Sequence, residues 1–141
     1  MLRGLTTVSF WAADLDAATR WYTELLGIAP YFERPGYAEF RLGDHQHELG
    51  LIDSRYAPGG APAGPGSGPG GAVVYWHVDD VQAVFARLLS MGAKEYEGPV
   101  ERGPGFVTAS VVDPFGNVLG VMYNAHYLEV LDGVRAVGGG A

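Results

Sequence analysis

Two side chains in this sequence are placed to do acid–base or metal chemistry together. His77 and Glu48 each lie on a segment in which apolar and polar residues alternate. An imidazole and a carboxylate in one cleft could act as a general acid and base, or as two ligands of a metal ion. The alternative is that both side chains form only local hydrogen bonds at the rim of the fold. The sequence leaves both interpretations open.

The other histidines point less clearly to chemistry. His45 and His47 are one residue apart, a spacing that can chelate a metal, but they flank a predicted hairpin turn and are expected at the surface. His126 follows the last predicted strand, and the sequence assigns it no role. The chain has no cysteine, which excludes disulfides, thiolate nucleophiles and cysteine-based zinc sites.

Three large side chains are candidates for contact with an apolar ligand. They are Trp11, Tyr75 and Met122. Aromatic rings offer a large contact area and stack on planar or cationic molecules. The alternative is that these side chains pack between the two halves of the chain.

An internal repeat supplies the elements that must position these side chains. Residues 7–14 (TVSFWAAD) resemble residues 73–80 (VVYWHVDD), and each segment alternates and then ends in Asp. Such a pattern is typical of a half-buried strand followed by the N-cap of a helix. Apolar residues at helical spacing then predict helices over 15–26 and 81–91, which are followed by Gly27 and Gly92.

Three further strands are predicted after each helix. They lie near 30–33, 37–42 and 47–53 in the first half, and near 94–97, 106–112 and 118–123 in the second. Each half therefore has the order β-α-β-β-β, and the predicted fold class is α+β.

Alternation along the strands sorts their side chains into two faces. One face is large and apolar and should lie beneath the helices; it carries Val8, Phe10, Leu49, Leu51, Val74, Trp76, Leu119 and Val121. The other face is mixed in character, as the walls of small-molecule pockets are. It carries Thr7, Ser9, Trp11, Glu48, Gly50, Val73, Tyr75, His77, Val118, Gly120 and Met122. An ordinary second core between the halves is the alternative.

Composition and charge restrict the classes of partner. The 141 residues are 48% hydrophobic and 18% charged, which is typical of a globular protein. The formal charge of −7 argues against nucleic acid or an anionic membrane as a partner. No apolar run approaches the ~18 residues that cross a bilayer. No secretory signal is recognisable, so a cytoplasmic protein is expected.

Glycine and proline dominate residues 57–72, which are expected to form a linker. The predicted organisation is a single domain over 1–124. It contains a first module at 4–56, the linker, and a second module at 73–124. Residues 125–141 are predicted to be a C-terminal tail.

Two motifs resemble the vicinal oxygen chelate superfamily, which includes glyoxalase I, bleomycin-resistance proteins, fosfomycin-resistance enzymes and extradiol dioxygenases. The motifs are the helix end Trp21-Tyr-Thr-Glu-Leu-Leu-Gly27 and the hairpin Asp113-Pro-Phe-Gly-Asn117, and the resemblance covers about residues 4–124. It implies that the two modules form a U-shaped mixed sheet around a cleft, with the helices on the outer face.

The resemblance also implies a metal site that this sequence does not retain. The family's His, Gln or Glu ligands correspond here to Thr7, Gly50, Val73 and Gly120, none of which supplies an imidazole, carboxylate or amide side chain. By resemblance to the bleomycin-resistance branch, we expect a protein that binds or sequesters a small organic molecule in the cleft, with no metal and no cofactor. The expected ligand-binding residues are Thr7, Ser9, Trp11, Glu48, Gly50, Tyr75, His77, Gly120 and Met122.

Two other functions stay open. The first is a metal-dependent lyase, isomerase or dioxygenase whose relocated site would use Glu48, His77 and a hairpin histidine. The second is a dimer whose cleft is filled by side chains and binds nothing. Because family members usually form dimers, the resemblance implies a homodimer, whose modules could pair within one chain or be exchanged between chains.

Overall fold

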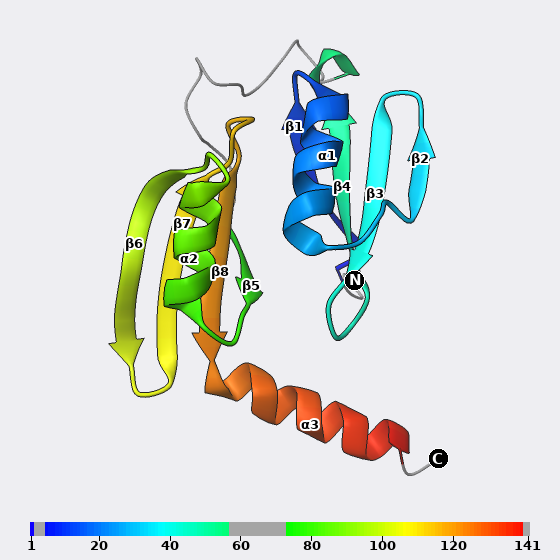
Figure 1. Ribbon diagram of the computed structural model, residues 1–141. Coiled ribbons are helices and arrows are strands. Elements are labelled where there is room, and N and C mark those ends of the chain that lie inside the picture. The colour runs from blue at the N-terminus through cyan, green and yellow to red at the C-terminus, as the bar shows by residue number, and fades with distance from the viewer. Residues whose placement is uncertain (2–4, 57–72, 140–141) are drawn as a thin grey trace. The chain divides into compact units, whose positions relative to one another are not determined.

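The computed structural model describes residues 1, 5–56 and 73–139 (Figure 1). The predicted linker at 57–72 lies outside the described residues. The chain divides into two compact units. Unit 1 comprises residues 1–70 together with 114–117, and unit 2 comprises residues 71–113 together with 118–141.

Unit 1 is a four-stranded mixed sheet with one helix on one face (Figure 1). Its elements are β1 (Thr7–Ala12), α1 (Leu15–Leu26), β2 (Phe32–Arg34), β3 (Tyr37–Leu42), β4 (His47–Asp53) and the 3₁₀ turn η1 (Ser54–Tyr56). The strand order is β1-β4-β3-β2, with β1 parallel to β4 and the other neighbours antiparallel.

Unit 2 repeats this topology. Its elements are β5 (Val74–His77), α2 (Val81–Ser90), β6 (Lys94–Gly103), β7 (Phe106–Val112), β8 (Val118–Asn124) and α3 (Ala125–Gly139). The strand order is β5-β8-β7-β6, and β5 is parallel to β8. The predicted α+β class and the paired β-α-β-β-β modules are therefore confirmed.

Both repeat helices begin at the predicted aspartates. A carboxylate oxygen of Asp14 accepts the backbone N–H of Ala17 at 3.0 Å, and that of Asp80 accepts the N–H of Ala83 at 3.0 Å. These bonds satisfy donors that the first turn of a helix leaves without partners. Gly27 ends α1 with a φ of 70°, a left-handed conformation that glycine adopts without strain.

The apolar face of each sheet forms a core beneath its helix. In unit 1 the buried set is Phe10, Phe40, Leu49 and Leu51, with Ala18 and Tyr22 from α1. In unit 2 it includes Val111, Leu119 and Val121, with Phe85 and Leu88 from α2. The predicted helix-facing parity is thus correct for these strand residues. The opposite face of the unit 1 sheet, which carries Thr7, Ser9 and Glu48, is called the open face below, whereas Thr108, Ser110 and Val118 on the corresponding face of unit 2 are buried.

The strand predicted at 94–97 is longer in the structure. β6 continues to Gly103, and its register against β7 shifts at three places, including one between Glu97 and Val100. Gly98 and Pro99 lie at that shift. Since proline cannot donate to the ladder and glycine often marks a bulge, this pair breaks the alternation that reveals a strand.

The segment predicted as a C-terminal tail forms a helix through residue 139. The Asn124 side chain accepts the backbone N–H of His126 at 3.0 Å, which caps α3. Leu131 is buried, whereas Val130 and Val134 are exposed. Apolar residues on several sides of the helix explain why the sequence shows no single buried stripe there.

The turn between β7 and β8 is part of unit 1. The Asn117 side-chain amide donates to the Trp11 carbonyl at 3.0 Å. The Phe115 ring meets the Trp21 ring edge-on, with centroids 6.2 Å apart. The motif predicted as a hairpin turn therefore also supplies a hydrogen bond and an aromatic contact to the first unit.

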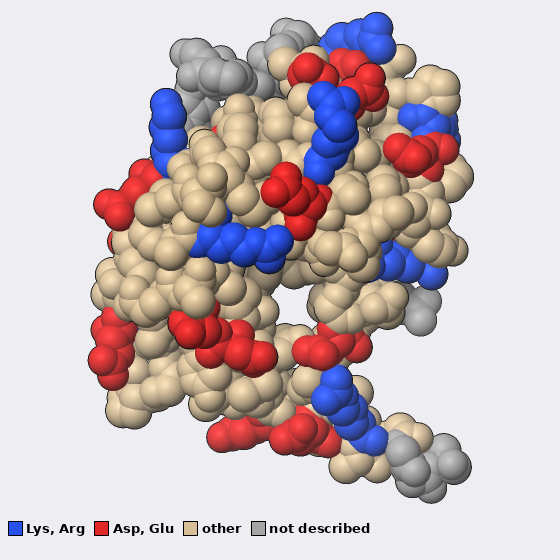
Figure 2. Space-filling view, viewed as in Figure 1, with Lys and Arg blue, Asp and Glu red and all other residues tan. Residues whose placement is uncertain are grey.

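Charged side chains of both signs are interspersed on the face seen in Figure 2, without a continuous basic patch on that face. Among the helices of residues 1, 5–56 and 73–139, none has the length and apolarity needed to cross a membrane.

Removing either helix cap should lower stability. We expect Asp14→Ala and Asp80→Ala each to reduce the free energy of unfolding by about 1 kcal/mol, because each leaves a first-turn N–H without its side-chain acceptor. Urea unfolding followed by circular dichroism measures the change. Asp14→Asn and Asp80→Asn are the controls, since Asn caps as well as Asp; losses as large as those of the Ala variants would contradict the capping role.

Candidate functional site

The open face of the unit 1 sheet brings together the predicted residues of the first half. Strand pairing places them in three rows: Thr7 beside Glu48, Ser9 beside Gly50, and Trp11 beside Ile52. β3 extends each row with a residue that sequence analysis did not assign to the site. These are Arg41, Glu39 and Tyr37, in the same order.

Glu48 is engaged within this face. Its carboxylate accepts the Thr7 hydroxyl at 3.4 Å and lies 3.3 Å from the Arg41 guanidinium. The same guanidinium lies over the Tyr31 ring, 3.9 Å from its centroid. Glu48 is therefore held in an ion pair whose partner is itself positioned by an aromatic ring.

The Tyr37 side chain covers Gly50. A Cβ added at Gly50 would lie 2.8 Å from the Tyr37 hydroxyl oxygen and 3.0 Å from the Ser9 hydroxyl oxygen. The Tyr37 hydroxyl donates to the Glu39 carboxylate at 2.6 Å. Burial raises the pKa of Tyr37 to about 12, and the hydrogen bond to Glu39 and the charges of Glu39 and Glu48 add to the effect.

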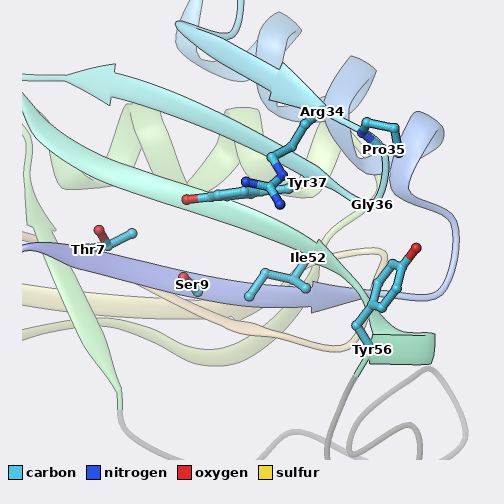
Figure 3. Close-up of a pocket in the computed structure, with 8 residues that line it drawn as sticks. All are labelled: Thr7, Ser9, Arg34, Pro35, Gly36, Tyr37, Ile52 and Tyr56. Atoms are coloured by element: carbon cyan, nitrogen blue, oxygen red, sulfur yellow. The ribbon is translucent and has the colours of Figure 1, made fainter.

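A pocket of about 530 Å³ lies on this open face, in the size range of small-molecule sites (Figure 3). Its lining residues come from four strands, the β2–β3 turn and η1: Thr7, Ser9, Arg34, Pro35, Gly36, Tyr37, Ile52 and Tyr56. Tyr56 packs on the turn, because a Cβ at Gly36 would clash with its ring. Gly36 also has a φ of 81°, a left-handed conformation that other residues rarely adopt. Both this conformation and the Tyr56 ring therefore disfavour a side chain at this position.

Only part of this pocket is predictable from the sequence pattern. Of the predicted residues, Thr7 and Ser9 line it, whereas Trp11, Glu48 and Gly50 are neighbours on the same face. Alternation along 37–42 and 47–53 could also have identified Tyr37 and Ile52. Arg34 and Tyr56 had no such signal, because their positions depend on a turn and on a 3₁₀ segment.

In unit 2, Tyr75 covers Gly120 as Tyr37 covers Gly50. A Cβ at Gly120 would be 2.6 Å from Cδ1 of Tyr75 and 2.7 Å from the Val74 carbonyl oxygen. Tyr75 pairs with Gly120 in the ladder and occupies the repeat position of Ser9. The covering ring thus comes from the first strand of the module in unit 2 and from its third strand in unit 1.

His77 lies next to this row, paired with Met122. Its side chain is 9% exposed, and Nδ1 accepts the backbone N–H of Asn124 at 3.3 Å. A neutral His77 with this bond carries its proton on Nε2. The ring stacks on Tyr127 of α3, with centroids 4.5 Å apart and an 11° angle between the planes.

Nε2 of His77 is buried and has no hydrogen-bond partner among the described residues. The Asp79 carboxylate is 3.7 Å away, beyond hydrogen-bond distance. The predicted local hydrogen bonding of His77 is therefore present at one ring nitrogen only.

The remaining histidines lie at the surface. His45 and His47 are exposed at the β3–β4 hairpin, as predicted, with ring centroids 5.4 Å apart. His126 is exposed near the start of α3, and its Nδ1 lies 3.6 Å from the Glu129 carboxylate.

The residues at the family's metal-ligand positions do not fit a metal ion. Thr7 offers only a hydroxyl, which donates to Glu48, and Val73 offers no donor side chain. Gly50 and Gly120 have no side chain, and tyrosine rings fill the space above them. Within residues 1, 5–56 and 73–139, no three His, Asp or Glu side chains are grouped so that they could hold a metal.

The two covered glycines should respond differently to an added methyl group. In Gly120→Ala the new Cβ would clash with the Val74 carbonyl oxygen and with Cδ1 of Tyr75, which lies next to the point where the ring joins its Cβ. In Gly50→Ala the new Cβ would approach the terminal hydroxyl of Tyr37 and the Ser9 hydroxyl. We expect Gly120→Ala to lower the free energy of unfolding by about 1–3 kcal/mol and Gly50→Ala by less than about 1 kcal/mol. Urea unfolding of both variants measures this order, which the reverse ranking would contradict.

Stability at alkaline pH should depend on Tyr37. An unfolded tyrosine ionises near its model value of 10.0, whereas the folded pKa of Tyr37 is about 12. This contribution is complete below pH 10 and is lost as the pH rises toward 12, because ionisation then favours the unfolded chain. We expect the wild type to lose more unfolding free energy than Tyr37→Phe between pH 9 and pH 11. Glu39→Gln, which removes the negative charge beside the Tyr37 hydroxyl, should show a smaller loss than the wild type.

Solved structures of similar fold were found for most of the chain. A glyoxalase-related enzyme from Fulvimarina pelagi has 22% identity and a TM-score of 0.69, covering 87% of this chain and 89% of its own. A lactoylglutathione lyase from Agrobacterium tumefaciens has 20% identity and a TM-score of 0.65, covering 90% and 97%. The bleomycin resistance determinant encoded on transposon Tn5 has 22% identity and a TM-score of 0.61, covering 87% and 99%. At these identities the likeness establishes the fold alone.

No protein of curated function matched the sequence. A family sequence profile, in contrast, matched residues 4–121, which is most of the chain. The paired β-α-β-β-β units agree with that match. The chain belongs to the Glyoxalase/Bleomycin resistance protein/Dioxygenase superfamily.

Proposed function

We propose that this protein binds a small organic molecule on the open face of its unit 1 sheet, without a metal at the family's ligand positions. The observation that carries the proposal is the covering of Gly50 by Tyr37 and of Gly120 by Tyr75. At each position the fold places an aromatic ring where a metal-binding side chain would extend. The chemistry left on these faces is apolar contact and hydrogen bonding.

The pocket beside Tyr37 is the site that we propose for the ligand. Ser9 and Thr7 contribute hydroxyl groups, and Ile52 and the tyrosine rings contribute apolar surface. A mixture of apolar walls with a few polar groups is what orients a small molecule in a pocket. Trp11 lies on the same face, in the row of Ile52, and is a natural fluorescent reporter of binding.

Among similar structures, one is named as a lactoylglutathione lyase and one as a bleomycin resistance determinant. The donor set of this chain favours binding or sequestration over metal-dependent lyase chemistry. A catalytic metal usually needs about three protein side chains as ligands. The four positions that correspond to the family's metal ligands supply no imidazole, carboxylate or amide side chain.

Metal analysis tests the metal-independent part of the proposal. We expect protein purified without a histidine tag to contain far less than one Zn, Ni, Mn or Fe per chain by mass spectrometry. Adding these ions after chelator treatment should leave the thermal midpoint unchanged. About one metal per chain that is lost in Glu48→Ala or His77→Ala would overturn this part and favour a relocated metal site.

Ligand binding tests the pocket itself. In a thermal-shift screen of small aromatic and heteroaromatic compounds, we expect hits whose affinity can then be measured through tryptophan fluorescence. Ser9→Phe should fill the pocket and weaken these hits at least about tenfold, which corresponds to about 1.4 kcal/mol.

The matched control is Ser90→Phe, which makes the same change at the exposed end of α2. It should leave the affinities of the hits unchanged. An absence of hits for the folded wild type, or equal affinities in wild type and Ser9→Phe, would overturn the proposed site.

A further inference from the structure

We infer that the unit 1 pocket takes an organic molecule that carries a carboxylate, and that Arg34 binds this carboxylate. The inference rests on the proposed function and deepens it by naming the chemical class of the ligand. The hydrogen-bond donors of the pocket that have no acceptor among the described residues indicate this class of ligand.

Arg34 is a cation that has no counter-ion among the described residues. Among the described residues, its guanidinium has no ion pair or hydrogen bond. Two other arginines of unit 1 are paired, Arg41 with Glu48 at 3.3 Å and Arg55 with Asp53 at 3.2 Å. A guanidinium that lines a pocket and lacks an internal partner is available to an anion from outside.

The β2–β3 hairpin directs Arg34 toward the pocket. Arg34 pairs with Tyr37 across this hairpin, and the turn between them is Pro35-Gly36. Directly paired residues place their side chains on the same sheet face, so Arg34 lies on the face of Tyr37 and Ser9, and Figure 3 shows all three among the residues that line the pocket. The planar fork can therefore meet a ligand that lies against the Tyr37 ring.

The hydroxyl groups of the pocket differ in what they can still donate. The Tyr37 hydroxyl donates its hydrogen bond to the Glu39 carboxylate at 2.6 Å. With a pKa of about 12, this hydroxyl stays protonated at neutral pH. Thr7 donates to Glu48. Ser9 has no hydrogen bond among the described residues and is exposed, so its hydroxyl is free to donate.

No carboxylate lines the pocket within the described part of the chain. The acids of the same face already accept hydrogen bonds, Glu39 from Tyr37 and Glu48 from Arg41 and Thr7. The pocket thus presents a guanidinium and a hydroxyl as free donors. A carboxylate, which only accepts hydrogen bonds and matches the guanidinium fork in two places, complements this set.

The rest of the lining selects the body of the ligand. Pro35, Ile52 and the rings of Tyr37 and Tyr56 provide apolar and aromatic surface. An aromatic or aliphatic carboxylate would therefore place its charged end at Arg34 and its body against these side chains. The net charge of −7 disfavours an anion at long range, so the affinity must come from these local contacts.

Matched acids and amides separate the charge of the ligand from its shape. The probes are benzoate, naphthalene-2-carboxylate, indole-3-carboxylate and biphenyl-4-carboxylate, each paired with its primary amide. Binding to the full chain is measured by tryptophan fluorescence and calorimetry. For at least one pair we expect the carboxylate to bind at least about tenfold more tightly than the amide, as a charge-assisted pair predicts.

Arg34→Gln should weaken that carboxylate about 10- to 100-fold and change the amide less than about twofold. The matched control is Arg20→Gln, which removes the same charge from an exposed position on α1, the helix on the opposite sheet face. It should change neither affinity by more than about twofold. Arg34→Lys, which keeps the charge but loses the planar fork, should fall between wild type and Arg34→Gln.

Four results would overturn the inference. If acid and amide bind equally well, or if Arg34→Gln and Arg20→Gln have equal effects, the ligand is not held through a carboxylate at Arg34, and the proposed pocket stands. If only uncharged molecules bind, the same conclusion holds. If neither these pairs nor the compounds of the thermal-shift screen bind the folded protein, the proposed function falls together with the inference.

Discussion

The contact on which the site depends is a tyrosine ring lying on a strand glycine. A ring at this distance fills the volume that a side chain at the glycine would need, so the position cannot also supply a metal ligand. The contact occurs in both units but is built differently. Tyr75 covers Gly120 from the neighbouring first strand, whereas Tyr37 reaches Gly50 from β3. Ser9 stands where the repeat would place a second ring, and this smaller side chain lines the unit 1 pocket.

The polar groups around this contact explain what the pocket can recognise. Each carboxylate beside the pocket is already engaged by a hydroxyl or a guanidinium from its own sheet. This pairing satisfies groups that would be costly to leave alone on a half-buried surface. Arg34 and Ser9 are left as free donors among the described residues of the pocket, although the chain carries a net negative charge. Local pairing, and not the total charge, therefore sets the class of ligand.

Much of the fold was predictable, because it follows from short-range rules. Asp14 and Asp80 mark helix starts, Gly27 marks a helix end, and strand alternation identifies the buried face. Two elements go beyond what was predicted, at places where these rules lose their signal: β6 is longer than the predicted strand, and the segment after β8 forms a helix. β6 contains Gly98-Pro99 and several register shifts, so its alternation is broken. α3 has apolar residues on both buried and exposed sides, so no stripe marks it as a packed helix.

The sequence by itself determined the repeat, the two faces of each sheet, and the absence of donor side chains at the four matched positions. These properties depend on residue type and on the two-residue period of a strand, both of which can be read along the chain. The tertiary structure alone decided which ring covers each glycine, that Arg34 lines a pocket with no partner in the described part of the chain, and that His77 stacks on Tyr127. Such contacts depend on turns and on residues distant in sequence, whose approach no local pattern encodes.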